Sequence, residues 1–229
     1  MPTKYYLGFI GSDDLTRCAD EVLEIRANGG AQPYAPVMNE LVKYFVPELL
    51  DSFLIKTADA VGLSHSASRI VHGAADTIGK ASSVLVGKLL AKRSNAELEG
   101  MVSFVDDTYL HAEVCSTGAN SVGCEIEKDL YDQMKRLVND VRAGKSEEVR
   151  AELHDVMITT VDVVLEGFML KAISLLKINF VLRKICDATV VTCRGAGHMV
   201  VNKVFKTLDE EQLMRLADYF DQLIITAES

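Results

Sequence analysis

Prolines and basic residues are scarce in this sequence. Only 4 prolines and 15 glycines occur in 229 residues, which leaves room for long regular elements. Lysine and arginine number 24 against 33 acidic residues, so the net charge at pH 7 is −9. This balance argues against a nucleic-acid-binding protein, which needs excess bases to neutralise phosphates. It also argues against a polybasic protein of the membrane surface.

Long uncharged runs and export signals are missing as well. No window of about 20 residues is free of charge, as a membrane-spanning helix would require, and the apolar run at residues 5–10 is too short for a signal peptide. The 5 cysteines are odd in number and scattered along the chain. We therefore expect free, buried thiols rather than a disulfide framework, and a reducing, cytoplasmic compartment.

Standard catalytic and cofactor motifs are also absent. The sequence has no GxxxxGK phosphate loop, no GxGxxG, no GxSxG elbow, no HExxH and no CxxC. The ExxH pairs of carboxylate-bridged di-iron bundles are missing too. These absences favour a protein that is not an enzyme. No cofactor is predicted, with a zinc or iron ion as the alternative.

Apolar residues at helical spacing dominate what is present. They make up 48% of the chain and recur every three or four residues in most segments. The sequence therefore predicts an all-α fold, a single-domain bundle over residues 1–229 with about seven or eight helices around a long central helix. An alternative division sets residues 1–32 apart as a semi-independent N-terminal element, because Gly29, Gly30 and two prolines follow it.

Capping residues mark several of the expected helices. Ser94-Asn95-Ala96-Glu97 is a capping box, and the helix that it opens is expected to reach Gly118. A second box, Thr207-Leu208-Asp209-Glu210, is expected to open the last helix. Further helices are predicted at residues 67–92 and 121–143. No internal repeat is evident.

The segment from Ser146 to about Cys186 is the predicted central helix. It lacks proline and has one glycine, Gly167, where a bend is expected. Three acidic residues, Asp155, Asp162 and Glu166, fall within one narrow stripe of this helix. We interpret the stripe as the solvated edge of the helix. The alternative is that the three carboxylates point into a cavity, where burial would raise their pKa values toward use as general acids.

Residues 188–205 allow two interpretations. Two β-branched or apolar runs flank Arg194-Gly195-Ala196-Gly197, a pattern that fits a β-hairpin. Helices are expected on both sides of this segment, which favours a broken helix.

One set of side chains has the chemistry of a metal site. His72 and Asp76 lie four residues apart on one predicted helix, and His111 and Cys115 lie four apart on the next. An antiparallel hairpin of these helices would bring the two pairs level. Two imidazoles, a thiolate and a carboxylate could then complete a tetrahedral zinc site.

Three functions remain open from the sequence. The first is a non-enzymatic interaction or scaffold protein that self-associates or binds a protein partner through its apolar surplus. The second is a helical bundle that binds a small apolar ligand or a metal, with enzymatic activity left open. The third is an amphitropic protein that inserts apolar helices into membranes, which the acids in those helices disfavour.

Overall fold

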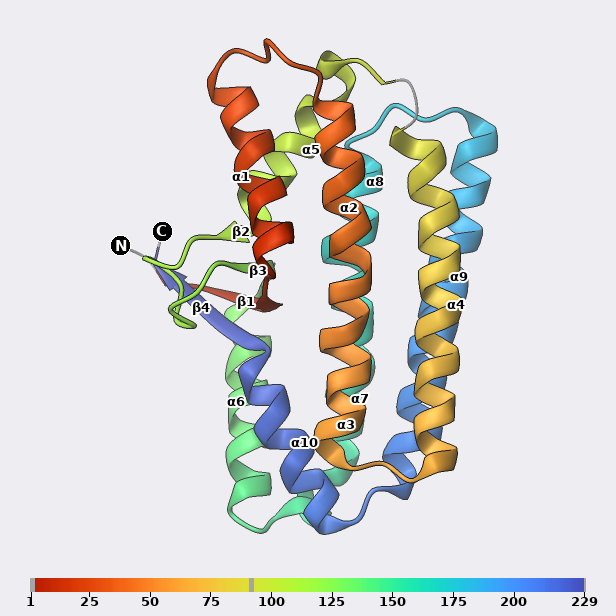
Figure 1. Ribbon diagram of the computed structural model, residues 1–229. Coiled ribbons are helices and arrows are strands. Elements are labelled where there is room, and N and C mark those ends of the chain that lie inside the picture. Colours follow the sequence, from red (N-terminus) through yellow and green to blue (C-terminus); the bar gives the residue numbers. More distant parts are fainter. Residues whose placement is uncertain (1–2, 91–92, 229) are drawn as a thin grey trace.

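The computed structural model describes residues 3–90 and 93–228, most of which are helical (Figure 1). A four-stranded antiparallel sheet flanks the helices, so the fold is α+β and the predicted all-α class is wrong in this respect. The strands are β1 (Thr3–Ile10), β2 (Tyr109–Leu110), β3 (Ser121–Ile126) and β4 (Ile224–Glu228).

Within the described residues the helical segments form eight rods. Two of the rods are long, and each contains a π-helical turn. In such a turn the hydrogen bonds span five residues instead of four, so the helix is locally wider. The first is α2 (Tyr34–Leu50), η1 (Asp51–Ile55) and α3 (Lys56–Val61), and the second is α7 (Ser146–Val164), η2 (Leu165–Leu170) and α8 (Lys171–Ser174). The others are α1 (Asp13–Ala27), α4 (His65–Leu90), α5 (Asn95–Thr108), α6 (Lys128–Arg142), α9 (Phe180–Val204) and α10 (Glu210–Gln222).

The elements lie in layers, as Figure 1 shows. The sheet is at one side, the two interrupted rods are in the middle, and α4 and α9 form the opposite side, where they pack against each other. One apolar core runs through all three layers and holds most of the buried side chains. Among residues 3–90 and 93–228, no helix combines the length and hydropathy that crossing a bilayer demands.

The chain passes through the same series of elements twice. Residues 3–110 run strand, helix, interrupted rod, long helix, helix and short strand, and residues 121–228 repeat that order. Gly8 on β1 pairs with Gly123 on β3. Adding 115 (123 minus 8) to a residue number in the first half gives its counterpart in the second. With this offset, α1 coincides residue for residue with α6.

The sheet obeys the same relationship. Tyr109 on β2 pairs with Val122 on β3, and their counterparts Ile224 and Leu7 pair on β4 and β1. A pseudo-two-fold axis therefore passes between Gly8 and Gly123. Because the strand order is β2-β3-β1-β4, neighbouring strands always come from different halves. Within residues 3–90 and 93–228, neither half contains a strand pair of its own.

Local signals repeat at the same offset. Capping boxes begin at Ser94 and at its counterpart Asp209, and the side chains of Ser64 and its counterpart Asn179 cap α4 and α9. The π-helical turns share a sequence, since residues 50–56 read LDSFLIK and residues 165–171 read LEGFMLK. The predicted absence of an internal repeat is therefore wrong, although outside this short segment the identical positions are scattered.

Several helix boundaries differ from the predictions. The last helix has its capping box at Asp209 and Gln212, two residues beyond the expected start. Helix α5 ends at Thr108 and not at Gly118, and residues 121–126 form β3 before α6 begins. The helix predicted over residues 67–92 is α4, apart from residues 91–92, which lie outside the described residues.

The predicted central helix is shorter than expected. Its rod ends at Ser174, and Gly167 lies in its π-helical turn, near the expected bend. The equivalent rod of the first half shares the central position (Figure 1). Residues 188–205 are helical almost throughout, within α9 and the start of the short 3-10 turn η3 (Phe205–Thr207), so neither the hairpin nor the break occurs.

The N-terminal residues pair with strands from the middle and from the C-terminal part of the chain. β1 lies between β3 and β4, and α1 packs against α2 and α5. The segment 1–32, which the alternative division sets apart, therefore contributes β1, one of the two inner strands of the sheet.

Candidate functional site

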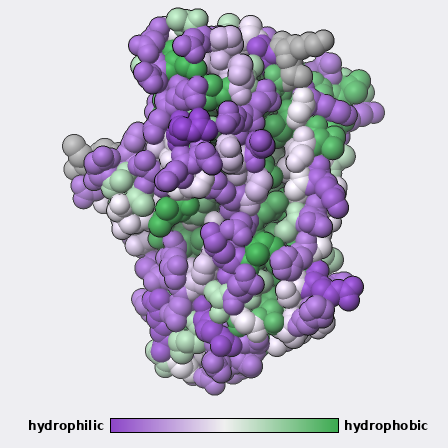
Figure 2. Space-filling view, viewed as in Figure 1, coloured by the Kyte–Doolittle hydropathy of each residue, from purple (hydrophilic) through white to green (hydrophobic). Residues whose placement is uncertain are grey.

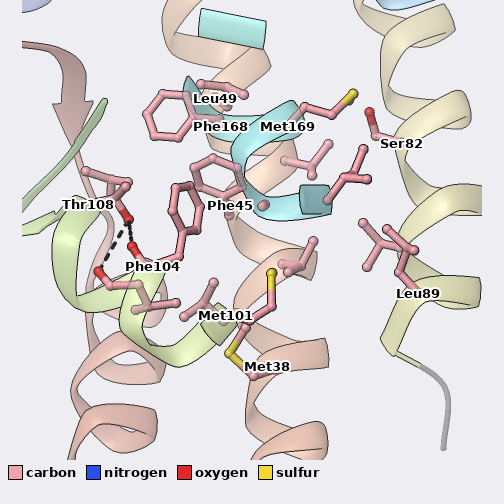
Figure 3. A pocket seen from close by; sticks show the side chains of 18 of the residues that line it. Met38, Phe45, Leu49, Ser82, Leu89, Met101, Phe104, Thr108, Phe168 and Met169 are labelled. Atoms are coloured by element: carbon pink, nitrogen blue, oxygen red, sulfur yellow. Dashed lines mark hydrogen bonds between the residues drawn. The ribbon is translucent and has the colours of Figure 1, made fainter. Parts of the chain in front are cut away.

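Two equivalent apolar cavities lie between the layers of the molecule, and residues from both halves of the chain line each of them. The first encloses about 160 Å³ between α2, α4, α5 and the η2–α8 segment. Three phenylalanines and three methionines are prominent in its wall (Figure 3), namely Phe45, Phe104, Phe168, Met38, Met101 and Met169. Methionine side chains are flexible and polarisable, so such a wall adapts to apolar ligands of different shapes.

The polar groups of this wall are few. The Thr108 hydroxyl donates to the backbone carbonyls of Phe104, at 2.8 Å, and Val105, at 3.3 Å, as the dashed lines in Figure 3 show. Its hydrogen-bonding capacity as a donor is thus used inside α5. Ser82 on α4, which Figure 3 labels, and Tyr109 on β2 carry the other hydroxyl groups of the lining residues. Such a cavity favours hydrocarbon and offers little to a charged ligand.

A second cavity, also of about 160 Å³, is the counterpart of the first. Most residues of its wall follow from the first wall by the 115-residue offset. Phe53 takes the place of Phe168, Thr57 that of Ala172, and Gly197 that of Ser82. The shared backbone path therefore creates the two cavities, since the side chains at equivalent positions often differ.

The two cavities meet at the pseudo-two-fold axis. Five residues line both of them: Leu49, Leu50, Ile78, Val164 and Leu165. All five are only half-buried, although they stand in the middle of the molecule. Apolar side chains accordingly show at the surface along the seam between α2 and α4 (Figure 2). The wall that divides the cavities is therefore accessible from this seam.

The π-helical turns place the aromatic side chains of the walls. The Phe168 ring packs edge-on against Phe45 at 5.2 Å between ring centroids, and the Phe53 ring meets Phe9 at 6.5 Å. Beside Phe168, Gly167 lies so close to β3 that an added Cβ would be 2.5 Å from the Cβ of Cys124. Each turn is thus pressed against a central strand of the sheet.

Cys124 is a buried thiol of β3 and not the first-turn residue of a helix. Burial raises its pKa to about 12, so the thiol stays protonated at neutral pH. All five cysteines are free and buried. They act as small apolar side chains rather than as nucleophiles.

The predicted metal ligands lie on different kinds of element. His72 and Asp76 are exposed on α4, as predicted for that helix. His111 and Cys115 lie beyond the end of α5, so the helical hairpin that would align the two pairs does not exist. Cys115 is buried, with its Sγ 3.1 Å from the Thr117 hydroxyl. No group of three or more metal-ligating side chains occurs among the described residues.

The three acidic residues of α7 and η2 do not enter either cavity wall. Asp155 and Glu166 are exposed. The Asp162 carboxylate accepts hydrogen bonds from Arg194, at 2.8 Å, and lies 3.1 Å from the His198 ring nitrogen, both on α9. The stripe is therefore a solvated edge with one ionic link between helices.

The cavity residues were not predicted from the sequence, because their spacing is that of ordinary core residues. One signal could have found them. The repeated segment LxxFxxK at residues 50–56 and 165–171 marks both π-helical turns, and through the 115-residue offset it would have revealed the two-fold plan. No protein-family model, curated protein or solved structure matches this chain.

Proposed function

We propose that this protein binds small apolar molecules, or segments of hydrocarbon chain, in its two cavities. One observation carries the proposal: two apolar cavities of about 160 Å³ recur at equivalent places although their side chains differ. Close packing is the rule in protein interiors, and voids larger than a water molecule are few. Two equivalent voids are therefore better explained as binding space than as packing defects.

The size of the cavities limits the ligand. A dry apolar cavity of about 150 Å³ holds benzene, so each cavity suits a small ring system or a short stretch of hydrocarbon. A longer chain would need to pass the shared wall at Leu49, Leu50 and Val164. The half-buried seam between α2 and α4 offers a path from solvent to the residues that line both cavities.

Naphthalene is a suitable first probe. At about 0.5 kcal/mol for each of its ten carbons, it should bind with a Kd on the order of 100 µM. Equilibrium dialysis should show two naphthalene molecules for each chain. Ala172→Phe should abolish binding in the first cavity, and its counterpart Thr57→Phe should abolish binding in the second.

Each variant should therefore retain one naphthalene, and the double variant none. Ala151→Phe is the matched control, because Ala151 is exposed on α7 outside both walls. Circular dichroism confirms that the variants are folded. Absence of binding by the unaltered protein, or binding that neither cavity variant reduces, would contradict the proposal.

The five free thiols support our proposal that the protein works in a reducing compartment, the cytoplasm. Other expectations from the sequence stay predictions: the self-associating scaffold or protein-partner function, the lack of enzymatic activity, and the disfavoured insertion into membranes. Native mass spectrometry of the purified chain would report its oligomeric state and any retained small molecule together.

A further inference from the structure

A basic patch lies where α4 finishes and α9 begins, although the chain as a whole is acidic. Residues 77–90 and 171–186 meet at this end of the molecule (Figure 1). The Arg93 guanidinium joins them by donating to the Lys177 carbonyl at 3.0 Å. The two segments contain six basic residues and no acidic residue. We define the basic cap as the exposed bases Lys88, Lys177, Arg183 and Lys184 together with the apolar residues Leu175, Phe180 and Val181.

The apolar members of the basic cap are unusually accessible. Phe180 is 71% exposed and Val181 is 65% exposed. The Lys184 ammonium lies 4.6 Å from the centroid of the Phe180 ring, so charge and apolar surface occupy one patch. Apolar side chains reach the surface at this end in Figure 2.

The opposite end provides an internal comparison. Under the 115-residue offset, Phe180 and Val181 correspond to His65 and Ser66, and Lys177 corresponds to Gly62. The segments equivalent to residues 77–90 and 171–186 are residues 192–205 and 56–71, which contain four basic residues and one acidic residue, and the acidic residues Asp209, Glu210 and Glu211 follow close by in the sequence. Because both ends have the same backbone plan, the fold does not require the exposed Phe180 and Val181, and the excess of bases is larger at the basic cap.

We propose that the basic cap docks on a bilayer that contains anionic phospholipid. Lysine and arginine gain energy near the negative lipid surface, and exposed Phe and Val side chains can enter the interface between headgroups and acyl chains. The net charge of −9 does not prevent docking. Charges beyond a Debye length, about 8 Å at physiological salt, are largely screened from the membrane.

The position of the basic cap links it to the first cavity. Leu89, Leu90 and Leu176 line that cavity and lie next to the basic cap in the sequence. Docking would bring this end of the cavity to the bilayer, where apolar molecules are concentrated. Docking itself does not depend on the cavities being ligand sites.

Vesicle co-sedimentation of the full chain tests the proposal. The protein should bind vesicles of phosphatidylcholine with phosphatidylserine, and bind pure phosphatidylcholine much less. The triple variant Lys177→Gln, Arg183→Gln, Lys184→Gln should lose roughly fivefold in affinity for each charge, or about a hundredfold in all. Phe180→Ser with Val181→Ser should also weaken binding, while leaving its salt dependence unchanged.

A control at the opposite end separates local charge from net charge. Arg69→Gln, Lys203→Gln, Lys206→Gln changes the net charge equally at exposed positions of the other end, and it should bind vesicles like the unaltered protein. Equal losses in the two triple variants would overturn the proposal. So would a preference for a soluble polyanion, such as heparin, over the vesicles. Vesicle binding without naphthalene binding would contradict the cavity function and support docking. Naphthalene binding without vesicle binding would support the cavity function and contradict docking.

Discussion

Gly8 and Gly123 face each other across the central strand pair, at the point where the pseudo-two-fold axis crosses the sheet. The strands approach so closely there that a Cβ on Gly8 would lie 2.3 Å from the Val122 carbonyl oxygen. A Cβ on Gly123 would have more room, with Tyr6 Cβ at 3.0 Å. The two halves therefore meet at a point where the first half, at Gly8, has no space for a side chain.

Gly8→Ala should destabilise the protein by about 1–3 kcal/mol, because the backbone carbonyl that it meets cannot move without breaking the strand pair. Gly123→Ala should cost less, since it meets side-chain atoms that can shift slightly. Urea unfolding followed by circular dichroism gives both free energies of unfolding. Gly73→Ala is the control: it meets nothing within 4 Å in the middle of α4, and alanine should raise stability there by about 0.5–1 kcal/mol.

Asp221 on α10 should stabilise the fold in a pH-dependent way. Burial alone would raise the pKa of Asp221, but hydrogen bonds from Lys135 and Arg142 lower it below the usual value. A lowered pKa stabilises the native state above the unfolded pKa, and this contribution is lost as the pH falls through the folded pKa. Asp221→Asn should therefore cost about 1–2 kcal/mol at pH 7, and the difference from the unaltered protein should shrink in acid.

The counterpart of Asp221 provides the control for that measurement. Asp106 on α5 bonds to Arg26 at 3.2 Å, but its side chain is 58% exposed, against 21% for Asp221. Asp106→Asn should cost less than about 0.5 kcal/mol at pH 7. Urea midpoints measured across the acid range compare the two variants. A constant gap between Asp221→Asn and the unaltered protein at every pH would contradict the assignment.

The halves should not fold separately. Every strand pair joins strands of different halves, so a fragment of residues 1–118 or 119–229 would hold no strand pair. Each fragment alone should lack a cooperative unfolding transition, and a mixture should regain the circular dichroism spectrum of the intact chain. Cooperative unfolding of either fragment alone would show that the helices are sufficient for folding.

The sequence predicted helices well where apolar residues recur at helical spacing, as for α4. It missed the sheet although β1 has eight residues, because the strands that pair with β1 are shorter and lie far along the chain. β3 occupies only six residues directly before α6, and the helix predicted over residues 121–143 includes them. β2 has two residues, too few for any periodic signal. Strand pairing between distant segments is a tertiary effect, which local patterns do not encode.

The candidate site was hidden for a different reason. Phe45, Phe168 and Met169 have the spacing of core residues, and only coordinates show that the space between them is unfilled. Net charge was also misleading for the surface. An overall excess of acids conceals the six bases of residues 77–90 and 171–186, because composition averages over both ends of the molecule.

The alternation of strands between halves has a consequence for how the halves stay together. As separate chains they would associate in a concentration-dependent way, with no sheet in the dissociated state. The connection over residues 111–120 makes this association intramolecular, at an effective concentration in the millimolar range for a short tether. Because the two halves belong to one chain, their sequences can differ at equivalent positions. The proposed lipid-binding surface can therefore occur at one end of the molecule and be absent from the equivalent end.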